Sequence, residues 1–156
     1  MAVDTILALD LGTTTGWALR RRDGGVVSGV EVFRPQHHEG GGMRYQRFRR
    51  WLGDTKRWTD DSIGLVVYEL VRRHSGTHAA HVYGGFQAML MAWCEHHGIQ
   101  YHGVPVGEIK RHATGSGNAD KAAVIEAMRR RGHSPADDNE ADALALLYWA
   151  IDHDWE

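Results

Sequence analysis

Residues 6–18, ILALDLGTTTGWA, decide the fold because they join two apolar strands through a tight turn. Apolar residues lead up to Asp10, a Gly-Thr-Thr-Thr-Gly turn follows it, and a second apolar run returns beside the first. A carboxylate at the end of a buried strand costs free energy unless a cation or hydrogen-bond donors meet it. Asp10 is therefore a candidate metal-binding or catalytic group, or else a cap that accepts hydrogen bonds from the backbone of the turn. The stretch alone leaves both interpretations open.

The chain length and amino-acid composition predict one domain, residues 1–156, with a full hydrophobic core. No run of about 18 apolar residues is present, so we expect no membrane span, and the N-terminus lacks the basic segment of a signal peptide. Cys94 is the single cysteine, which excludes an internal disulfide and fits a reducing cytoplasm. The apolar neighbours of Cys94 favour a position in the core over a role as a nucleophile.

The formal net charge of the chain is -2, but its basic residues gather in short runs. The distribution of charge, more than its total, decides whether a protein binds nucleic acid.

Hydrophobic periodicity predicts an α/β fold, with three antiparallel strands followed by alternating helices and strands. The expected strands are 5–11, 16–21, 26–33, 63–71 and 99–104, and the expected helices are 43–58, 79–97, 107–113, a segment from Asn118 or Asp120 to about Arg131, and 138–151. The strand 63–71 is almost continuously apolar, which predicts a central position covered on both faces. Gly84 and Gly85 inside the helix 79–97 predict close packing of another helix.

Acidic residues mark the ends of two predicted strands and the start of the last helix. Asp10 ends the first strand, Glu69 lies near the end of the most apolar strand, and Asp138 and Asp142 lie one turn apart on the helix. If the first and fourth strands are neighbours, these carboxylates converge and cannot all stay ionised without cations. Hard oxygen ligands at this density suit Mg²⁺ or Mn²⁺. Two simpler interpretations stay open: Glu69 could pair with an arginine, and the acids of residues 137–140 could serve a helix N-terminus.

Four segments together resemble the RuvC-type Holliday-junction resolvases of the RNase H-like superfamily. They are LALDLGTTTGWAL (7–19), VVYELV (66–71), EIKRHATGSGNADKAAV (108–124) and DDNEADALALL (137–147), in that order and at suitable separations. The third is the most specific, because a lysine, a Thr-Gly-x-Gly turn and Ala-Asp-Lys before a helix are hard to explain by fold alone. The resemblance covers nearly the whole chain. It implies a five-stranded sheet of order 3-2-1-4-5 flanked by helices, a homodimer, and cleavage of four-way DNA junctions with two Mg²⁺ or Mn²⁺ ions in each active site.

Carried over residue by residue, the resemblance implies that Asp10, Glu69 and Asp142 are catalytic carboxylates that bind the metal ions. The family usually has an acid or a histidine three residues before the last aspartate, and this chain has Asn139 there. Asp138 is adjacent and lies on nearly the same helix face. We therefore expect Asp138 to be the fourth catalytic carboxylate and metal ligand, with a carbonyl ligand from Asn139 as the alternative.

Four basic residues are the expected contacts to DNA. Lys110 and Lys121 match family positions that would meet DNA phosphates. In the loop after the fourth strand, better-known bacterial members have an aromatic residue, whereas this chain has Arg72, Arg73 and His74. Phosphate or cation–π contacts from Arg72 and Arg73 therefore replace base stacking as the expectation.

The same resemblance implies an origin, a cellular location and partners for the protein. The compact chain and its departures resemble the phage-encoded branch of the family more than the bacterial one. We expect a cytoplasmic location in a bacterial cell, no membrane partner, and a homodimer formed through the helix 79–97. The sequence does not identify a helicase partner.

Three other functions stay open at this point. The opening LDLGTTTGWA (9–18) also resembles the phosphate-binding segment of sugar kinases, actin and chaperone ATPases, but those folds pair two such domains and need a far longer chain. A non-catalytic or RNA-processing RNase H-like nucleic-acid-binding protein would have the same fold and bind no metal at the acids. A dimeric interaction module would use the acids only as helix caps.

Overall fold

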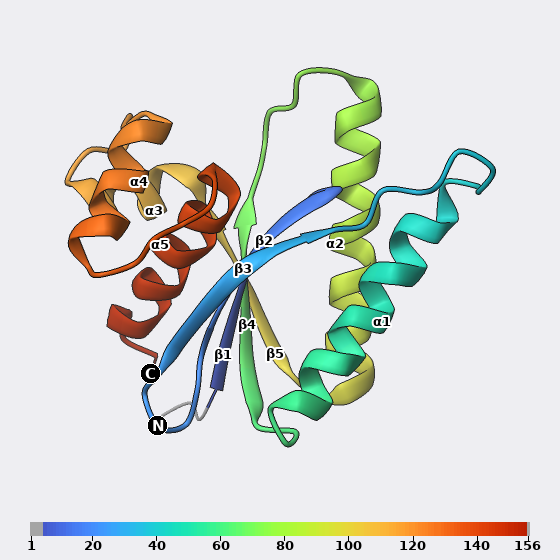
Figure 1. Ribbon diagram of the computed structural model, residues 1–156, viewed down its shortest axis with the longest axis horizontal. Helices are drawn as coiled ribbons and strands as arrows, with labels where there is room; N and C mark the ends of the chain where they lie inside the picture. Colours follow the sequence, from blue (N-terminus) through green and yellow to red (C-terminus); the bar gives the residue numbers. More distant parts are fainter. Residues whose placement is uncertain (1–4, 156) are drawn as a thin grey trace.

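The structure, a computed structural model, describes residues 5–155 (Figure 1). Its strands are β1 (Thr5–Asp10), β2 (Thr14–Arg20), β3 (Val26–Val32), β4 (Ile63–Leu70) and β5 (Gln100–Pro105). Its helices are α1 (Gly42–Trp58), α2 (Thr77–His97), α3 (Val106–Thr114), α4 (Lys121–Arg130) and α5 (Asp138–Asp152). Every predicted element is present, and its ends differ from the prediction by at most a few residues. In residues 5–155, no helix has both the length and the apolar character that crossing a membrane requires.

The five strands form one mixed sheet in the order β3-β2-β1-β4-β5, which confirms the expected topology. β1 pairs antiparallel with β2 and parallel with β4, so it lies at the centre with β4 beside it. Leu9 of β1 lies opposite Tyr68 of β4. Asp10 and Glu69 therefore come at the next position on two adjacent strands, at the same end of the sheet.

Helices cover both faces of the sheet, with α1 and α2 on one face and α3, α4 and α5 on the other (Figure 1). Because side chains alternate along a strand, Leu7 and Leu9 of β1 enter the core beneath α1 and α2. Ile6 and Ala8 enter the opposite core, beneath α5. Asp10 follows Ile6 and Ala8 in this alternation, so its side chain lies on the face of the sheet that α5 covers.

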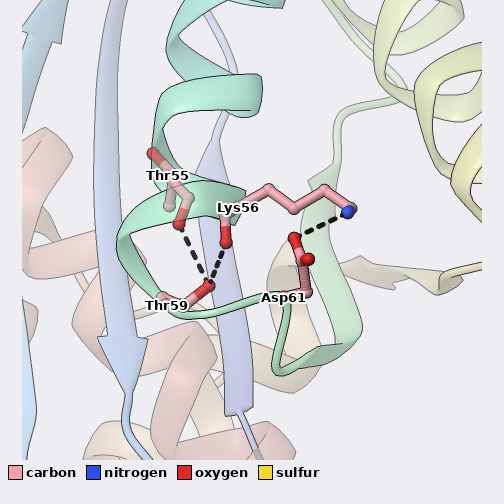
Figure 2. A network of polar contacts seen from close by, with 4 residues as sticks. All are labelled: Thr55, Lys56, Thr59 and Asp61. Carbon is pink, nitrogen blue, oxygen red and sulfur yellow. Dashed lines mark hydrogen bonds and ion pairs between the residues drawn. The ribbon is translucent and has the colours of Figure 1, made fainter.

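Helix α1 ends in a compact polar turn that leads the chain into β4 (Figure 2). The hydroxyl of Thr59 donates to the carbonyl oxygens of Thr55 and Lys56, each at 3.0 Å. The ammonium of Lys56 lies 2.8 Å from a carboxylate oxygen of Asp61. Asp60 and Asp61 have φ angles of 53° and 59°, a left-handed region in which aspartate is several-fold enriched over other non-glycine residues. The turn thus satisfies carbonyl groups that the end of a helix leaves without partners.

The two glycines of α2 have different surroundings. A Cβ atom on Gly85 would overlap the end of the Tyr45 side chain of α1, so Gly85 leaves the space in which this ring packs against α2. The predicted packing of another helix is therefore found at Gly85, where a side chain of α1 makes the contact. A Cβ atom on Gly84 would meet no atom within 4 Å. Cys94 lies buried in the core beneath α1 and α2, as predicted, and burial raises the pKa of its thiol to about 12.

Candidate metal centre

Three carboxylates from distant parts of the chain meet at one end of the sheet. Asp10 is the last residue of β1, Glu69 is the last but one of β4, and Asp142 lies in the second turn of α5. One carboxylate oxygen from each lies within 4.8 Å of the other two, and all three side chains are partly buried. The structure thus brings together three of the residues that the sequence singled out.

Gly16 lets α5 come close to the sheet at this point. Gly16 pairs with Asp10 across β1 and β2, and a Cβ atom on Gly16 would overlap the backbone carbonyl of Asn139 in α5. No side chain fits between this strand and this helix, so Gly16 sets how near the start of α5 comes to Asp10. Reasoning from the sequence assigned Gly16 only to the turn and the start of a strand. A lone glycine within a strand pattern is nevertheless a signal of close backbone approach.

Two further acids fix the start of α5. The carboxylate of Asp137 accepts a hydrogen bond from the backbone N–H of Glu140 at 2.9 Å and thereby caps the helix. The side chain of Glu140 is buried, and it accepts hydrogen bonds from the hydroxyl of Ser28 in β3, at 2.6 Å, and from the N–H of Ala136, at 2.8 Å. The helix-capping interpretation therefore holds for Asp137, while Glu140 ties α5 to β3. The sequence analysis missed the contact with Ser28, which joins residues far apart in the chain.

Burial raises the pKa values of all three clustered acids, and repulsion by neighbouring carboxylates raises those of Asp10 and Asp142 further. Burial is the largest cause for Asp10, whose pKa lies well above its ordinary value, and the charges of Glu69 and Asp142 raise it further. Burial also raises the pKa of Glu69, against the opposing charge of Lys110. The pKa of Asp142 rises to about 7, again mainly through burial. The three groups therefore resist being ionised together unless positive charge is added.

The two simpler interpretations of Asp10 and Glu69 find no support in the described chain. The turn after Asp10 is closed by Thr15, whose hydroxyl donates to the carbonyl of Gly12 at 2.6 Å and accepts from its N–H at 3.3 Å. Within residues 5–155 no donor makes a hydrogen bond to the Asp10 carboxylate, so it does not cap the turn. No arginine of that range pairs with Glu69, whose carboxylate instead experiences the charge of Lys110.

Asp138 and Asn139 lie outside the triad of Asp10, Glu69 and Asp142. The carboxylate of Asp138 lies 3.2 Å from the ammonium of exposed Lys121, on α4. Asp138 is still near enough for its charge to raise the pKa values of Asp10 and Asp142. The amide of Asn139 donates a long hydrogen bond, 3.5 Å, to Asp137. In the structure Asp138 is thus held by Lys121 and Asn139 by Asp137, and a fourth ligand from either residue stays a prediction.

Basic side chains line the approach to the triad. Lys110 of α3 and Lys121 of α4 line a pocket of about 190 Å³ together with Glu69 and Asp142. Arg72 and Arg73 are exposed on the loop that joins β4 to α2, which begins directly after Glu69 and Leu70. All four basic residues predicted to contact DNA therefore lie on elements that adjoin the acids.

The donor set of the triad fits a hard divalent cation. Three carboxylates supply only oxygen ligands, which suit Mg²⁺ or Mn²⁺. Burial is the largest cause of their raised pKa values, so a bound cation would favour the ionised carboxylates. Neither a histidine nor the single cysteine belongs to the cluster in the described chain, which argues against a zinc site of the usual type.

Replacing Asp142 with asparagine is expected to stabilise the metal-free protein at pH 8. The pKa of this carboxyl is about 7 in the folded chain and about 3.9 in an unfolded one. Because folding raises the pKa, ionisation destabilises the fold, and the wild-type chain loses stability as the pH rises from about 4 to about 7. We expect Asp142→Asn to be more stable by roughly 1–3 kcal/mol at pH 8 and by less at pH 5.

Urea unfolding in EDTA at pH 5 and pH 8 measures this difference. Asp154→Asn is the matched control, because Asp154 is exposed shortly after the end of the same helix. Added Mg²⁺ or Mn²⁺ should stabilise the wild-type chain and the control more than Asp142→Asn. A variant that is less stable than the wild type at pH 8 in EDTA would contradict the electrostatic account of the cluster.

Comparison with known proteins supplies the family of folds to which this arrangement belongs. No protein-family profile matches the sequence, and no curated protein sequence matches it. Among solved structures, Thermus thermophilus RuvC superposes with a TM-score of 0.74 at 19% identity, over 94% of this chain and 95% of that one. The chain has the RuvC fold. RuvC of the same organism in complex with a Holliday junction substrate gives a TM-score of 0.76 at 19% identity, over 92% of this chain and 90% of that one.

A more distant protein shares the RuvC fold. The yeast mitochondrial Holliday junction resolvase Ydc2 superposes with a TM-score of 0.59 at 13% identity, over 92% of this chain and 76% of that one. The order of the five strands and the helices on both faces match the expectation of an RNase H-like sheet. At these identities the RuvC fold is what the comparison establishes, so the chemistry has to be argued from the residues of this chain.

Proposed function

We propose that this chain is a divalent-metal-dependent endonuclease that resolves four-way DNA junctions by paired symmetric nicks. The observation that carries the proposal is the meeting of Asp10, Glu69 and Asp142 within 4.8 Å on the RuvC fold. Two structures with this fold are named for the same activity or substrate: RuvC with a Holliday junction, and the yeast resolvase. We take residues 1–156 as a single RNase H-like nuclease domain.

The chemistry we assign is hydrolysis of a phosphodiester with two Mg²⁺ or Mn²⁺ ions. As in the proteins that the sequence resembles, Asp10 would bind both ions, Glu69 and Asp142 would bind one or the other, and Asp138 would complete the set of ligands after leaving Lys121. When bound, the ions would lower the pKa of a water molecule and stabilise the charge on the leaving 3′ oxygen. Lys110 and Lys121 would hold the backbone phosphates beside the acids.

The same face of the protein offers charge for holding branched DNA. Arg72 and Arg73 on the β4–α2 loop and Lys110 and Lys121 on α3 and α4 are the contacts we propose. Lysine and arginine contacts to phosphates supply most of the sequence-independent affinity for DNA, and this affinity falls steeply with salt. Junction binding should therefore be strong at low ionic strength despite the formal net charge of -2.

A homodimer is part of the proposal, because two-fold symmetry would place two active sites on opposing strands of a junction. Helix α2 is the surface that we propose for it. Gly85 of this helix is used by the contact with α1, whereas Gly84 faces open space and would admit a second chain. Sedimentation of the purified protein measures whether it is a dimer. We also propose a phage-encoded protein that acts in the bacterial cytoplasm without a membrane partner.

Incubating the purified protein with labelled four-way junctions, with and without Mg²⁺, tests the function. We expect symmetric nicks in opposing strands that require the ion, and much slower cleavage of a linear duplex of the same sequence. Junction binding without cleavage in either Mg²⁺ or Mn²⁺ would instead support a non-catalytic RNase H-like nucleic-acid-binding protein. The ion pair between Asp138 and Lys121 favours that second function, because it leaves three carboxylates rather than four in position.

A further inference from the structure

Tyr83 of α2 makes hydrogen bonds to the backbone at the end of the strand that carries Glu69. Its hydroxyl donates to the carbonyl oxygen of Glu69 at 2.7 Å and accepts from the N–H of Val71 at 3.3 Å. The Tyr83 side chain is buried in the core beneath α1 and α2. Burial raises the pKa of this phenol, so it stays a hydrogen-bond donor at neutral pH. Tyr83 therefore binds the backbone of β4 from the face of the sheet that α1 and α2 cover. The Glu69 carboxylate meets Asp10 on the opposite face.

The same side chain also contacts the loop that follows β4. Val71, at the start of the loop, donates to the Tyr83 hydroxyl, and the ring of His74 lies 5.1 Å from the Tyr83 ring. Arg72 and Arg73 lie in the chain between these two contacts and are exposed. A displacement of the loop by DNA would thus be transmitted to Tyr83 at both of its attachment points.

We propose that Tyr83 is a positioning residue that couples DNA contact at Arg72 and Arg73 to the place of Glu69 in the acidic triad. The inference rests on the nuclease function proposed above and adds a residue that the acids and lysines do not include. Groups that orient a metal ligand without touching the metal commonly change metal affinity or activity by 10–100-fold when they are removed. Tyr83 acts in this way through the backbone of Glu69.

The test replaces the Tyr83 hydroxyl with hydrogen, in Tyr83→Phe, and compares it with Tyr68→Phe. Tyr68 is the matched control because it is a buried tyrosine next to Glu69 in the chain, but its hydroxyl contacts Gln87 instead. Three quantities are measured for each variant: Mn²⁺ affinity without DNA, the single-turnover rate constant for cleavage at saturating protein, and junction affinity in an Asp10→Asn background. Circular dichroism and thermal unfolding confirm that both variants are folded.

We expect Tyr83→Phe to weaken Mn²⁺ binding about fivefold and to slow cleavage about tenfold, with junction affinity unchanged within about twofold. Tyr68→Phe should match the wild type in all three. A loss of packing alone would not separate the rate constant from the affinity for DNA in this way. Equal losses in both variants, or wild-type behaviour of Tyr83→Phe, would overturn the proposal.

Coupling to the loop is tested by combining Tyr83→Phe with the double replacement Arg72→Ala and Arg73→Ala. At saturating protein, the double replacement should slow cleavage in the wild-type chain and have little further effect when Tyr83 is phenylalanine. Additive losses would show that the loop acts without Tyr83. If the wild-type protein binds Mn²⁺ but does not cut junctions, the nuclease function fails, while the Mn²⁺ affinities of the two tyrosine variants still decide whether Tyr83 positions Glu69.

Discussion

Replacing Asp10 with asparagine is expected to slow junction cleavage by at least about 1,000-fold while leaving junction binding intact or slightly tighter. Asp10 shares the triad with Glu69 and Asp142, and the charges of both neighbours act on it. An amide keeps the shape of the side chain but removes the negative charge that would hold two cations. One negative charge fewer also reduces repulsion of DNA phosphates. Single-turnover cleavage with Mg²⁺ and fluorescence anisotropy with a labelled junction measure the two effects.

Asp54→Asn is the control for this variant, because Asp54 is exposed on α1 and, among residues 5–155, forms an ion pair with exposed Arg57 alone. It should cleave at the wild-type rate. Unfolding cannot explain a loss of activity in Asp10→Asn, since removing a buried carboxylate with a raised pKa should leave the metal-free protein at least as stable as before. Cleavage that continues at the wild-type rate in each bound complex, or a variant that loses only binding, would contradict a catalytic role for Asp10.

The fold and the triad could be predicted because their signals are local and periodic. The apolar run of β4 and the strand–turn–strand pattern around Asp10 place Glu69 and Asp10 at the ends of strands on sequence alone. The period of two along a strand and the four-residue spacing on α5 then determine which faces Asp10, Glu69 and Asp142 occupy. The adjacency of β1 and β4 and the docking of α5 against their ends had to be assumed, and the resemblance to RuvC-type proteins supplied the strand order.

The remaining features of the site depend on contacts that no local pattern encodes. The ion pair of Asp138 with Lys121 joins two helices, and the bond from Tyr83 to Glu69 crosses from a helix to the backbone of a strand. The first depends on how two helices of the same face pack, and the second on how a helix packs on the sheet, and propensity and periodicity report neither. The role of Gly16 could be predicted in part, because a glycine within a strand indicates that another backbone comes close but does not identify the segment that does so.

Gly16→Ala is expected to destabilise the protein by about 2–3 kcal/mol and to weaken Mn²⁺ binding at least tenfold. The new methyl group would overlap the backbone carbonyl of Asn139 and lie 3.0 Å from the N–H nitrogen of Glu140. Backbone atoms in the capped first turn of a helix cannot move aside as a flexible side chain can, so the start of α5 has to shift away from β2. Because Gly16 pairs with Asp10, that shift carries Asp142 away from the other two acids.

Gly12→Ala, in the same turn, separates this effect from the general cost of replacing a glycine. A Cβ atom on Gly12 would meet the carbonyl oxygen of Thr14 at 3.5 Å, an ordinary contact. Its free energy of unfolding in urea should stay within about 1 kcal/mol of the wild type. If Gly16→Ala were destabilised but still bound Mn²⁺ with wild-type affinity, the start of α5 would not be what brings the third carboxylate to the sheet. The close approach that Gly16 allows would then not be needed for the metal centre, and its proposed role there would be wrong.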